Sequence, residues 1–351
     1  MTTSTIRDVA REAGVSIASA SRALNGHSNV TPGTRDRVLE AARTLDYVPH
    51  LGARSLSTRR SETIGVVLPD LFGEYFSEII RGIDYAAHRR GLQLLLSNMH
   101  GSAHETAVAI RAMRGRVDGL LVMSPQIDAE FLTRNLPKGL PAVLMNSRVE
   151  SARHATISID NRAGARAAVA HLVAQGCRRI AHLSGPRGNA DAEEREAGFR
   201  ETVLEMLGDD APIVLAGDFS EEAGTAAGHL LTAGKIEIDG LFSANDIMAI
   251  GCMAEFRDVG VRVPHDVAVI GFDDVPIARY VTPALSTIGV RIAALGELAL
   301  ERLVAAIEAP DAPPAPSEHL TPELIVRASS TRRPTIATTK PPDSREQGRA
   351  A

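Results

Sequence analysis

The sequence predicts a small all-helical domain at the N-terminus, followed by an α/β core of two lobes, each built on a doubly wound parallel sheet. Three observations lead to this prediction. Apolar residues recur at helical spacing throughout residues 1–47. From Ser61 onward, short apolar strands alternate with amphipathic helices, which is typical of parallel sheets covered on both faces. More strands are expected than one sheet normally holds, so we expect the core to divide into two lobes.

The first two helices are expected to be joined by a tight turn. Thr5 and Asp8 have the spacing of a capping box, which predicts a helix over Ile6–Ala13. Ser16 is a suitable N-cap for a second helix over Ile17–Leu24, and a preceding glycine permits the turn. A helix, a turn with glycine, and a second helix with small residues at the crossing form a helix-turn-helix pattern. A plain helical bundle docked on the next domain is the alternative.

A third helix and a linker complete the N-terminal region. Thr31 and Pro32 suit the N-cap and first position of a helix that should end near Leu45. Its expected buried stripe consists of Val38, Leu39, Ala42 and Leu45. Residues 48–60 are basic and polar, and so short a segment is not a stable isolated helix in water, so we expect a hinge linker there. The helix-turn-helix domain is therefore assigned to residues 1–47.

The core is expected over residues 61–328, with strands and helices in alternation. The expected strands cover residues 63–68, 92–97, 119–123, 142–145, 156–159, 180–184, 213–216, 240–243, 267–271 and 286–288, with two short strands near 317–320 and 323–326. The expected helices include residues 74–90, 161–175, 191–207, 221–233, 247–259 and 292–309. Residues 329–351 lack a hydrophobic pattern, and we expect them to form a disordered tail.

Charge is distributed unevenly along the chain, whose net charge is −5. Residues 1–60 contain nine Arg, no Lys and five acidic residues, which gives +4. Residues 329–351 contain five basic and two acidic residues, which gives +3, so the segment between them carries −12. A basic N-terminal segment on an acidic body indicates an anionic polymer as partner for that segment, and an ordinary solvated helix face is the alternative.

Several classes of protein and site find no support in the sequence. The two cysteines, Cys177 and Cys252, exclude a disulfide scaffold and a cysteine-based zinc site, and they fit a reducing cytoplasm. We expect no membrane partner, because the N-terminus lacks the apolar segment of a secretory signal and no apolar run could span a bilayer. The 11 histidines do not stand at metal-ligand spacings, and no HExxH, GxSxG, Walker A or GxGxxG motif is present. We therefore expect no metal, no cofactor and no catalytic residues, with an active site assembled from distant loops as the alternative.

Motifs along nearly the whole chain resemble those of one family. In the helical region and linker they are TIRDVAREAGVS (5–16), SRALNG (21–26), VTPGTR (30–35) and ARSL (53–56). In the core they are TIGVVLPDL (63–71), RxxGF (195–199), SANDIMAIG (243–251), VIGFDD (269–274) and ALSTI (284–288). In order and spacing they resemble the LacI/GalR family of bacterial transcription regulators. The resemblance implies a core like a type I periplasmic sugar-binding protein, with lobe one at 61–159 and 289–316 and lobe two at 160–288 and 317–328.

For the DNA side, the resemblance implies that the second helix enters the major groove with Ile17, Ala18 and Arg22 at base-reading positions. The guanidinium of Arg22 can donate to guanine O6 and N7, whereas Ile17 and Ala18 can read only shape and thymine methyl groups. Leu56 stands where family members insert a leucine into the minor groove, and packing on the core is its alternative. The expected phosphate contacts are Thr5, Ser16, Ser19, Ser21, Asn25 and Thr34. Helix capping is the alternative role of these short polar side chains.

For the effector, the resemblance implies a site in the cleft between the lobes. The expected contacts are Asp70, Tyr75, Phe76, Asn146, Arg148, Arg195, Asn245 and Asp273. Side chains of this polarity suit hydroxyl-rich ligands. The alternatives are capping for Asp70 and Asn245, a solvated ion pair for Arg195, and core packing for Tyr75 and Phe76. The chain departs from the common family pattern at two of these segments, so the chemistry of the pocket is not transferable in detail.

These expectations combine into one hypothesis. We expect a cytoplasmic, homodimeric DNA-binding transcription regulator, and more specifically a repressor of a palindromic operator that responds to a small molecule, a sugar or sugar derivative. A sugar-binding receptor without a DNA function is one alternative, but it leaves residues 1–60 unexplained. An α/β enzyme acting on a sugar is another, but the sequence offers no recognisable nucleophile and base.

Overall fold

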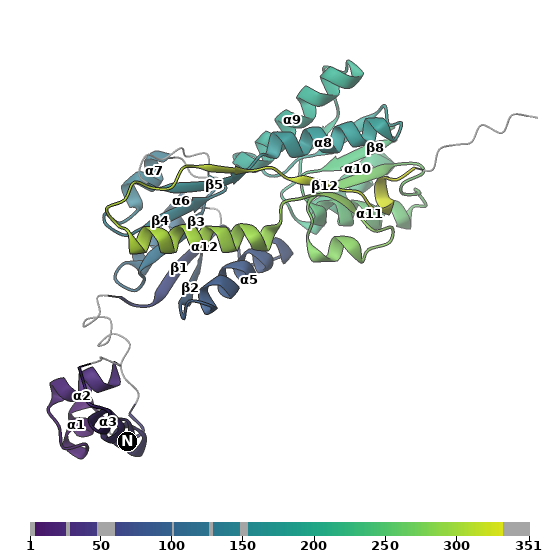
Figure 1. Ribbon diagram of the computed structural model, residues 1–351. Coiled ribbons are helices and arrows are strands. Elements are labelled where there is room, and N and C mark those ends of the chain that lie inside the picture. Colours follow the sequence, from purple (N-terminus) through teal and green to yellow (C-terminus); the bar gives the residue numbers. More distant parts are fainter. Residues whose placement is uncertain are drawn as a thin grey trace, which may run out of the picture. The chain divides into compact units, whose positions relative to one another are not determined.

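The computed structural model describes residues 4–25, 29–47, 60–99, 102–125, 129–147 and 154–332 (Figure 1). The chain divides into two compact units, which we describe separately. Unit 1 comprises Met1–Ser158 and Ala293–Glu318, and unit 2 comprises Ile159–Ile292 and His319–Ala351. The chain passes between the units after residues 158, 292 and 318, and the lobes expected from the sequence change after residues 159, 288 and 316. Residues 48–59 of the expected linker, which include Leu56, and the expected effector contact Arg148 lie outside the described residues.

The N-terminal region contains three helices with a core of their own. They are α1 (Ile6–Glu12), α2 (Ile17–Leu24) and α3 (Pro32–Thr44). Small residues dominate that core, which consists of Val9, Ala10, Ala13, Ala20, Ala23, Val38, Ala41 and Ala42. The capping box at α1 is confirmed, because the Thr5 N–H donates to the Asp8 carboxylate at 3.0 Å. The predicted N-cap of α2 is also confirmed, because Ser16 Oγ accepts from the Ser19 N–H at 3.1 Å.

One detail of α3 was predicted wrongly. Leu39 is 37 % exposed, whereas Ala41 is 4 % exposed and belongs to the core. The buried stripe follows Val38, Ala41, Ala42 and Leu45, which is the spacing of a single helix face. Leu39 lies about 100° away from Val38 around the helix and therefore points off this face.

The first six-stranded sheet has the order β11-β5-β4-β3-β1-β2. Its strands are β1 (Thr63–Leu68), β2 (Gln93–Asn98), β3 (Gly119–Met123), β4 (Ala142–Met145), β5 (Ala155–Ile159) and β11 (Glu318–Leu320). The pairs from β2 across to β5 are parallel. The accompanying helices are α5 (Glu74–His88), α6 (Ala103–Met113), α7 (Ala129–Asn135) and α12 (Ile292–Glu308). A Cβ on Gly82 would lie 1.9 Å from the Ala293 carbonyl oxygen, so a glycine is what lets α5 approach α12 this closely.

The second six-stranded sheet has the order β12-β10-β9-β8-β6-β7. Its strands are β6 (Ile180–Leu183), β7 (Val214–Leu215), β8 (Gly240–Ser243), β9 (Ala268–Asp273), β10 (Ser286–Gly289) and β12 (Glu323–Ile325). All pairs are parallel except β10 with β12. The helices are α8 (Asn161–Ala174), α9 (Ala190–Leu207), α10 (Glu221–Ala233) and α11 (Asp246–Asp258). Helices α8 and α9 lie on one face of the sheet and α10 and α11 on the other, as in a doubly wound fold (Figure 1).

The C-terminal segment is ordered further than the sequence predicted. Ser329 and Ser330 form part of a 3-10 turn, η2 (Ala328–Ser330), and both are fully buried. The prediction that disorder begins at residue 329 is therefore wrong for residues 329–332. The small polar side chains conceal this burial in the sequence, because they pair with buried polar groups rather than with an apolar face: Ser329 Oγ donates to the Val269 carbonyl at 2.7 Å. Within the described residues, no helix has the length and apolar character needed to cross a membrane.

Candidate functional site

The exposed face of α2 carries the three expected base-reading residues. Ile17, at the first position of the helix, is 48 % exposed, which is unusual for a large aliphatic side chain. Ala18 and Arg22 are exposed on the same helix, and Arg22 Nε donates to the Ala18 carbonyl at 3.2 Å. An aliphatic and a guanidinium group are therefore displayed on α2, whose opposite face is buried.

The six expected phosphate contacts stand at helix termini and pair with other side chains there. Thr5 Oγ1 donates to Asp8 at 2.7 Å, and the hydroxyls of Ser16 and Ser19 are 2.9 Å apart. Asn25 Nδ2 approaches Ser21 Oγ at 3.4 Å. Thr34 Oγ1 accepts from Thr31 Oγ1 at 2.9 Å. Ser16 is exposed, so capping and phosphate binding are compatible roles for it.

In unit 1, Asp70 follows β1 and holds the turn after it. Its Oδ1 accepts from the Leu71 N–H at 2.7 Å and from the Phe72 N–H at 3.1 Å. Asn98 Nδ2, at the end of β2, lies 3.3 Å from the same oxygen. Asp70 therefore has the turn-capping role that the sequence left open, while its side chain stays at the exposed carboxyl end of the sheet.

The next polar residues of unit 1 follow β3 and β4. Asn146 is 4 % exposed, and its Nδ2 donates to the Tyr75 hydroxyl at 3.1 Å. The rings of Tyr75 and Phe76 meet edge to face, with centroids 5.4 Å apart. Ser124, which the sequence reasoning missed, is 1 % exposed, and its Oγ has no hydrogen-bond partner among the described residues. The structure thus brings Asn146 and Tyr75 together at the carboxyl ends of these strands, where ligands of α/β folds bind.

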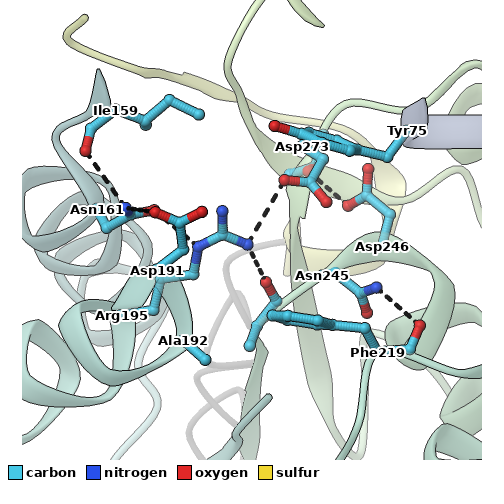
Figure 2. A network of polar contacts seen from close by, with 12 residues as sticks. Tyr75, Ile159, Asn161, Asp191, Ala192, Arg195, Phe219, Asn245, Asp246 and Asp273 are labelled. Atoms are coloured by element: carbon cyan, nitrogen blue, oxygen red, sulfur yellow. Dashed lines mark hydrogen bonds and ion pairs between the residues drawn. The ribbon is translucent and has the colours of Figure 1, made fainter. Parts of the chain in front are cut away.

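In unit 2, Arg195 is the centre of a buried polar network (Figure 2). Its side chain is 4 % exposed, so the solvated ion pair considered for it is ruled out. Nε donates to Asn161 Oδ1 at 2.8 Å, and Nη1 donates to the Ala244 carbonyl at 2.5 Å. The guanidinium carbon lies 3.7 Å from the centroid of the Phe272 ring, which places the cation over an aromatic face. Helix α9 delivers Arg195 to this position from its buried side.

Asp273 faces the guanidinium from the end of β9. Its Oδ1 lies 3.5 Å from Arg195 Nη1, and this buried oxygen makes no hydrogen bond within the described chain. Burial raises the pKa of Asp273 to about 7; Arg195 opposes this shift and Asp191 adds to it. A carboxyl group that titrates near neutrality in such a site can accept a hydrogen bond from a ligand hydroxyl when ionised and donate one when protonated.

Asn245 and Asp246 begin α11 beside this network. Asn245 Oδ1 accepts from the Met248 N–H at 2.9 Å, which confirms the capping alternative, and Nδ2 donates to the Phe219 carbonyl at 3.0 Å. Asp246 is fully buried, and burial together with the nearby Asp273 raises its pKa well above the usual value. Its carboxyl group accepts from Thr287 Oγ1 at 2.5 Å. The sequence motif around Asn245 therefore supplies both the helix cap and part of the network.

Besides Asp246 and its partner Thr287, sequence reasoning missed four further members of the unit 2 network. Asn161 supports Arg195 and also donates to Asp191 Oδ1 at 2.9 Å. Phe272 lies under the guanidinium, and Phe219 provides the carbonyl that Asn245 contacts. Two of them carried a readable signal, because Asn161 begins α8 one residue after β5 and Phe272 directly precedes Asp273. Asp191 and Phe219 lie in loop-to-helix segments whose direction the sequence alone does not give.

The arrangement favours binding over catalysis or metal coordination. A network that offers carboxylate, amide and guanidinium groups beside aromatic rings matches the pattern of hydroxyl-bearing ring ligands. Among the residues that the structure describes, no group of three His, Cys, Asp or Glu side chains could hold a metal ion. Cys177 and Cys252 are buried, and burial raises their thiol pKa values to about 11 and about 12, so both are poor nucleophiles.

Comparisons with known proteins find matches to both the N-terminal helical region and the α/β core. A model of bacterial regulatory proteins of the lacI family matches residues 5–50, and a model of the periplasmic binding protein-like domain matches residues 169–330. The ribose operon repressor of Halalkalibacterium halodurans is 33 % identical over 306 residues, which covers 87 % of this chain and 90 % of that protein. A lac repressor dimer bound to operator and the anti-inducer ONPF has a TM-score of 0.85 at 28 % identity, covering 94 % of this chain and 100 % of that one. A complex of the regulator CelR with cellobiose has a TM-score of 0.69 at 31 % identity, covering 93 % and 100 %.

Proposed function

This chain belongs to the LacI family of bacterial regulatory proteins, and we propose that it is a repressor whose homodimer binds a palindromic operator under the control of a carbohydrate effector. As a member of this family it is a DNA-binding transcriptional regulator and not an enzyme. The relatives that support the repressor role include a ribose operon repressor and a lac repressor dimer on its operator. We place its action in the cytoplasm, where bacterial operator DNA lies.

On the DNA side, the exposed face of α2 supports the proposal. Ile17, Ala18 and Arg22 would meet base edges when the N-terminal half of α2 enters the major groove. Arg22 would read a guanine with two hydrogen bonds, and Ile17 would contact a thymine methyl group. The polar residues at the helix termini would contact phosphates, as proposed for Thr5, Ser16, Ser19, Ser21, Asn25 and Thr34. Leu56 would insert into the minor groove at the operator centre.

The homodimer is supported by apolar side chains exposed on each unit. Tyr85 on α5 is 57 % exposed and Leu96 on the edge strand β2 is 38 % exposed. In unit 2, Tyr280 is 74 % exposed just after the short 3-10 helix η1 (Pro276–Arg279). Large apolar side chains at the surface favour burial against another chain, and a two-fold dimer would match the two-fold symmetry of a palindromic operator.

The observation that carries the effector proposal is the buried network around Arg195. Its polar groups are fixed by hydrogen bonds before any ligand arrives, which lowers the entropic cost of binding. Hydroxyl pairs of a sugar ring could bond to Asp273 and Asn245 while an aromatic face covers the ring's apolar side. In unit 1 the proposed contacts are Asp70, Tyr75, Phe76, Asn146 and Arg148. The relative in complex with cellobiose supports a carbohydrate as the class of effector.

Control by the effector would be a coupling between two binding equilibria. A sugar that binds one conformation of the core better than another shifts the population toward that conformation, and operator affinity changes in proportion. A sugar that prefers the conformation incompetent for DNA would act as an inducer. One that prefers the competent conformation would act as a corepressor.

The test combines a gel-shift assay with a screen of sugars. Purified protein is titrated against palindromic sequences from upstream of its own and neighbouring genes, at several salt concentrations, with and without D-ribose, D-galactose or cellobiose. We expect salt-sensitive binding to one palindrome and a change in affinity with one sugar. Absence of binding to any palindrome would refute the operator proposal. Operator binding that no carbohydrate alters would refute the effector class alone.

A further inference from the structure

The turn that presents Asp273 is in an unfavourable backbone conformation. Asp273 has a φ of 111° and Asp274 a φ of 57°, both in the left-handed region that residues with a Cβ rarely adopt. A turn of this kind persists only where surrounding contacts hold it in place. The contacts that hold it therefore also determine where the Asp273 carboxyl group lies.

Three hydrogen bonds within unit 2 hold this turn, and Arg279 Nη2 adds a longer ion-pair contact to the Asp274 carboxylate at 4.0 Å. The Asp274 N–H donates to Thr287 Oγ1 at 3.3 Å, and the Val275 N–H donates to the Asp246 carboxyl group at 2.9 Å. The third contact comes from the C-terminal segment: Arg327 Nη2 donates to the Asp274 carboxylate at 2.5 Å. Thr287 lies on the neighbouring strand β10 and Asp246 is the first residue of α11, whereas Arg327 lies 53 positions further along the chain.

Arg327 is itself fixed at both its backbone and its side chain. Its N–H donates to Ser286 Oγ at 2.7 Å, and its Nη1 donates to the Leu285 carbonyl at 2.8 Å. The side chains of Arg327 and Asp274 are only 16 % and 22 % exposed, so solvent screens this ion pair less than a surface pair. The guanidinium therefore bridges two fixed points, the loop before β10 and the turn after β9. The planar guanidinium does this with two different nitrogens in a fixed geometry, which the single ammonium nitrogen of a lysine does not offer.

We propose that Arg327 is a positioning residue for the effector site, which acts through Asp274 to hold the Asp273 carboxyl group against Arg195. Arg327 touches neither Arg195 nor Asp273 in the described contacts, so its effect on a ligand is indirect. The inference rests on the proposed carbohydrate site. It also gives the ordered C-terminal segment a role in the proposed effector site, in addition to its structural role.

Arg332 provides a matched control in the same segment. Its N–H donates to Gln175 Oε1 and its Nε donates to the Pro264 carbonyl, both at 3.0 Å. Like the contacts of Arg327, these hydrogen bonds hold the C-terminal segment against the rest of unit 2. They lie away from the turn after β9. Loss of Arg332 should therefore reduce stability without moving Asp273.

The experiment compares four full-length variants with the wild type: Arg327→Gln, Arg332→Gln, Asp274→Asn and the double variant Arg327→Gln/Asp274→Asn. Three quantities are measured: the Tm, hydrogen exchange of a peptide covering residues 271–276, and the Kd for whichever of D-ribose, D-galactose and cellobiose stabilises the wild type. We expect Arg327→Gln to speed exchange and to weaken sugar binding about tenfold. Asp274→Asn should do the same, and the double variant should be no worse than either single one.

Arg332→Gln should lower the Tm while leaving both exchange and sugar affinity unchanged. Sugar affinity unaffected by Arg327→Gln, or weakened equally by Arg332→Gln, overturns the proposal. If no sugar binds the wild type, the proposed effector class fails, and the exchange measurement alone decides whether Arg327 positions the turn. Unchanged exchange in Arg327→Gln then overturns the proposal as well.

Discussion

Mild acid should destabilise unit 2 through His182, a histidine that lies fully buried in β6. Its ring stacks against both Phe199 and Phe242, with centroids 5.0 and 4.8 Å away. Nδ1 lies 2.9 Å from the Phe242 carbonyl, so the neutral ring donates there, while Nε2 is buried without a hydrogen-bond partner among the described residues. A protonated ring would carry a second N–H with no acceptor. Burial therefore lowers the pKa of His182 from 6.5 to about 4.

The sign of the effect follows from this direction. Because the folded-state pKa is below the unfolded one, the unfolded chain binds more protons between pH 4 and pH 6.5. The stability that the neutral ring preserves is present above pH 6.5 and is lost as the pH falls through this window. The shift corresponds to roughly 3 kcal/mol in full, of which about 2 kcal/mol is lost between pH 7 and pH 5. Asp273 acts in the opposite direction, because its raised pKa makes it stabilising at low pH and destabilising as the pH rises.

The assay is urea unfolding followed by circular dichroism at pH 7 and pH 5, for the wild type and for His182→Phe. The phenyl ring keeps the stacking but does not titrate, so the variant should lose about 2 kcal/mol less than the wild type between the two pH values. His104→Gln, at an exposed position on α6, is the control and should behave as the wild type. An equal pH response in the wild type and His182→Phe would refute the reasoning.

Four further predictions concern DNA, effector and packing. Arg22→Ala should cost about 1–3 kcal/mol at one guanine of the half-site; a uniform loss across half-site variants in gel shifts would contradict base reading. Leu56→Ala should weaken operator binding more than binding to nonspecific DNA, and equal losses would argue against minor-groove insertion. Asp273→Asn should weaken sugar binding about tenfold at pH 8 and remove the pH dependence of sugar affinity near neutrality, as measured by calorimetry. If the variant keeps this pH dependence, a group other than Asp273 causes it. Gly82→Ala should cost about 1–3 kcal/mol of stability in urea unfolding, whereas Gly33→Ala, whose Cβ meets no atom within 4 Å, should not.

The regular elements were largely predictable from the sequence because their signals are local. The strand over Thr63–Leu68 and the helix over Glu221–Ala233 were predicted to the residue. Both are bounded by residues that terminate regular structure; the strand is a short, nearly continuous apolar run, and the helix is bounded by Ser220 and Gly234. The α2 boundaries were equally readable, since Ser16 caps the helix through its own side chain.

The polar network was predictable only in part. Asp273, Asn245 and Arg195 were expected from the resemblance, but the residues alone gave Arg195 as a candidate for a solvated ion pair. Its neighbours in the sequence are acidic, and what buries it is Phe272 and the Ala244 carbonyl, which come from other elements. A sequence read locally does not show which distant groups will surround a charge, so burial of a polar side chain is harder to predict than burial of an apolar one.

The same reason explains the error at the C-terminal segment. Ser329 and Ser330 look like the start of a disordered tail, because serine carries no apolar signal. In the fold Ser329 Oγ bonds to the Val269 carbonyl, and Ser330 Oγ lies 2.9 Å from His171 Nε2. These partners are distant in sequence, and only the assembled sheet brings them within reach.

In unit 2, the same residues build the fold and form the proposed ligand site. Asn245 was expected either to cap α11 or to contact the effector, yet its two amide atoms are fixed by the Met248 N–H and the Phe219 carbonyl. Fixing the side chain in one rotamer leaves its remaining amide proton and lone pair in a defined direction, which is what a preorganised site requires. The capping role is therefore compatible with the proposed binding role. It follows that Asn245→Ala should lose helix stability and sugar affinity together, and a variant that lost affinity at unchanged Tm would show that the cap is dispensable for the site.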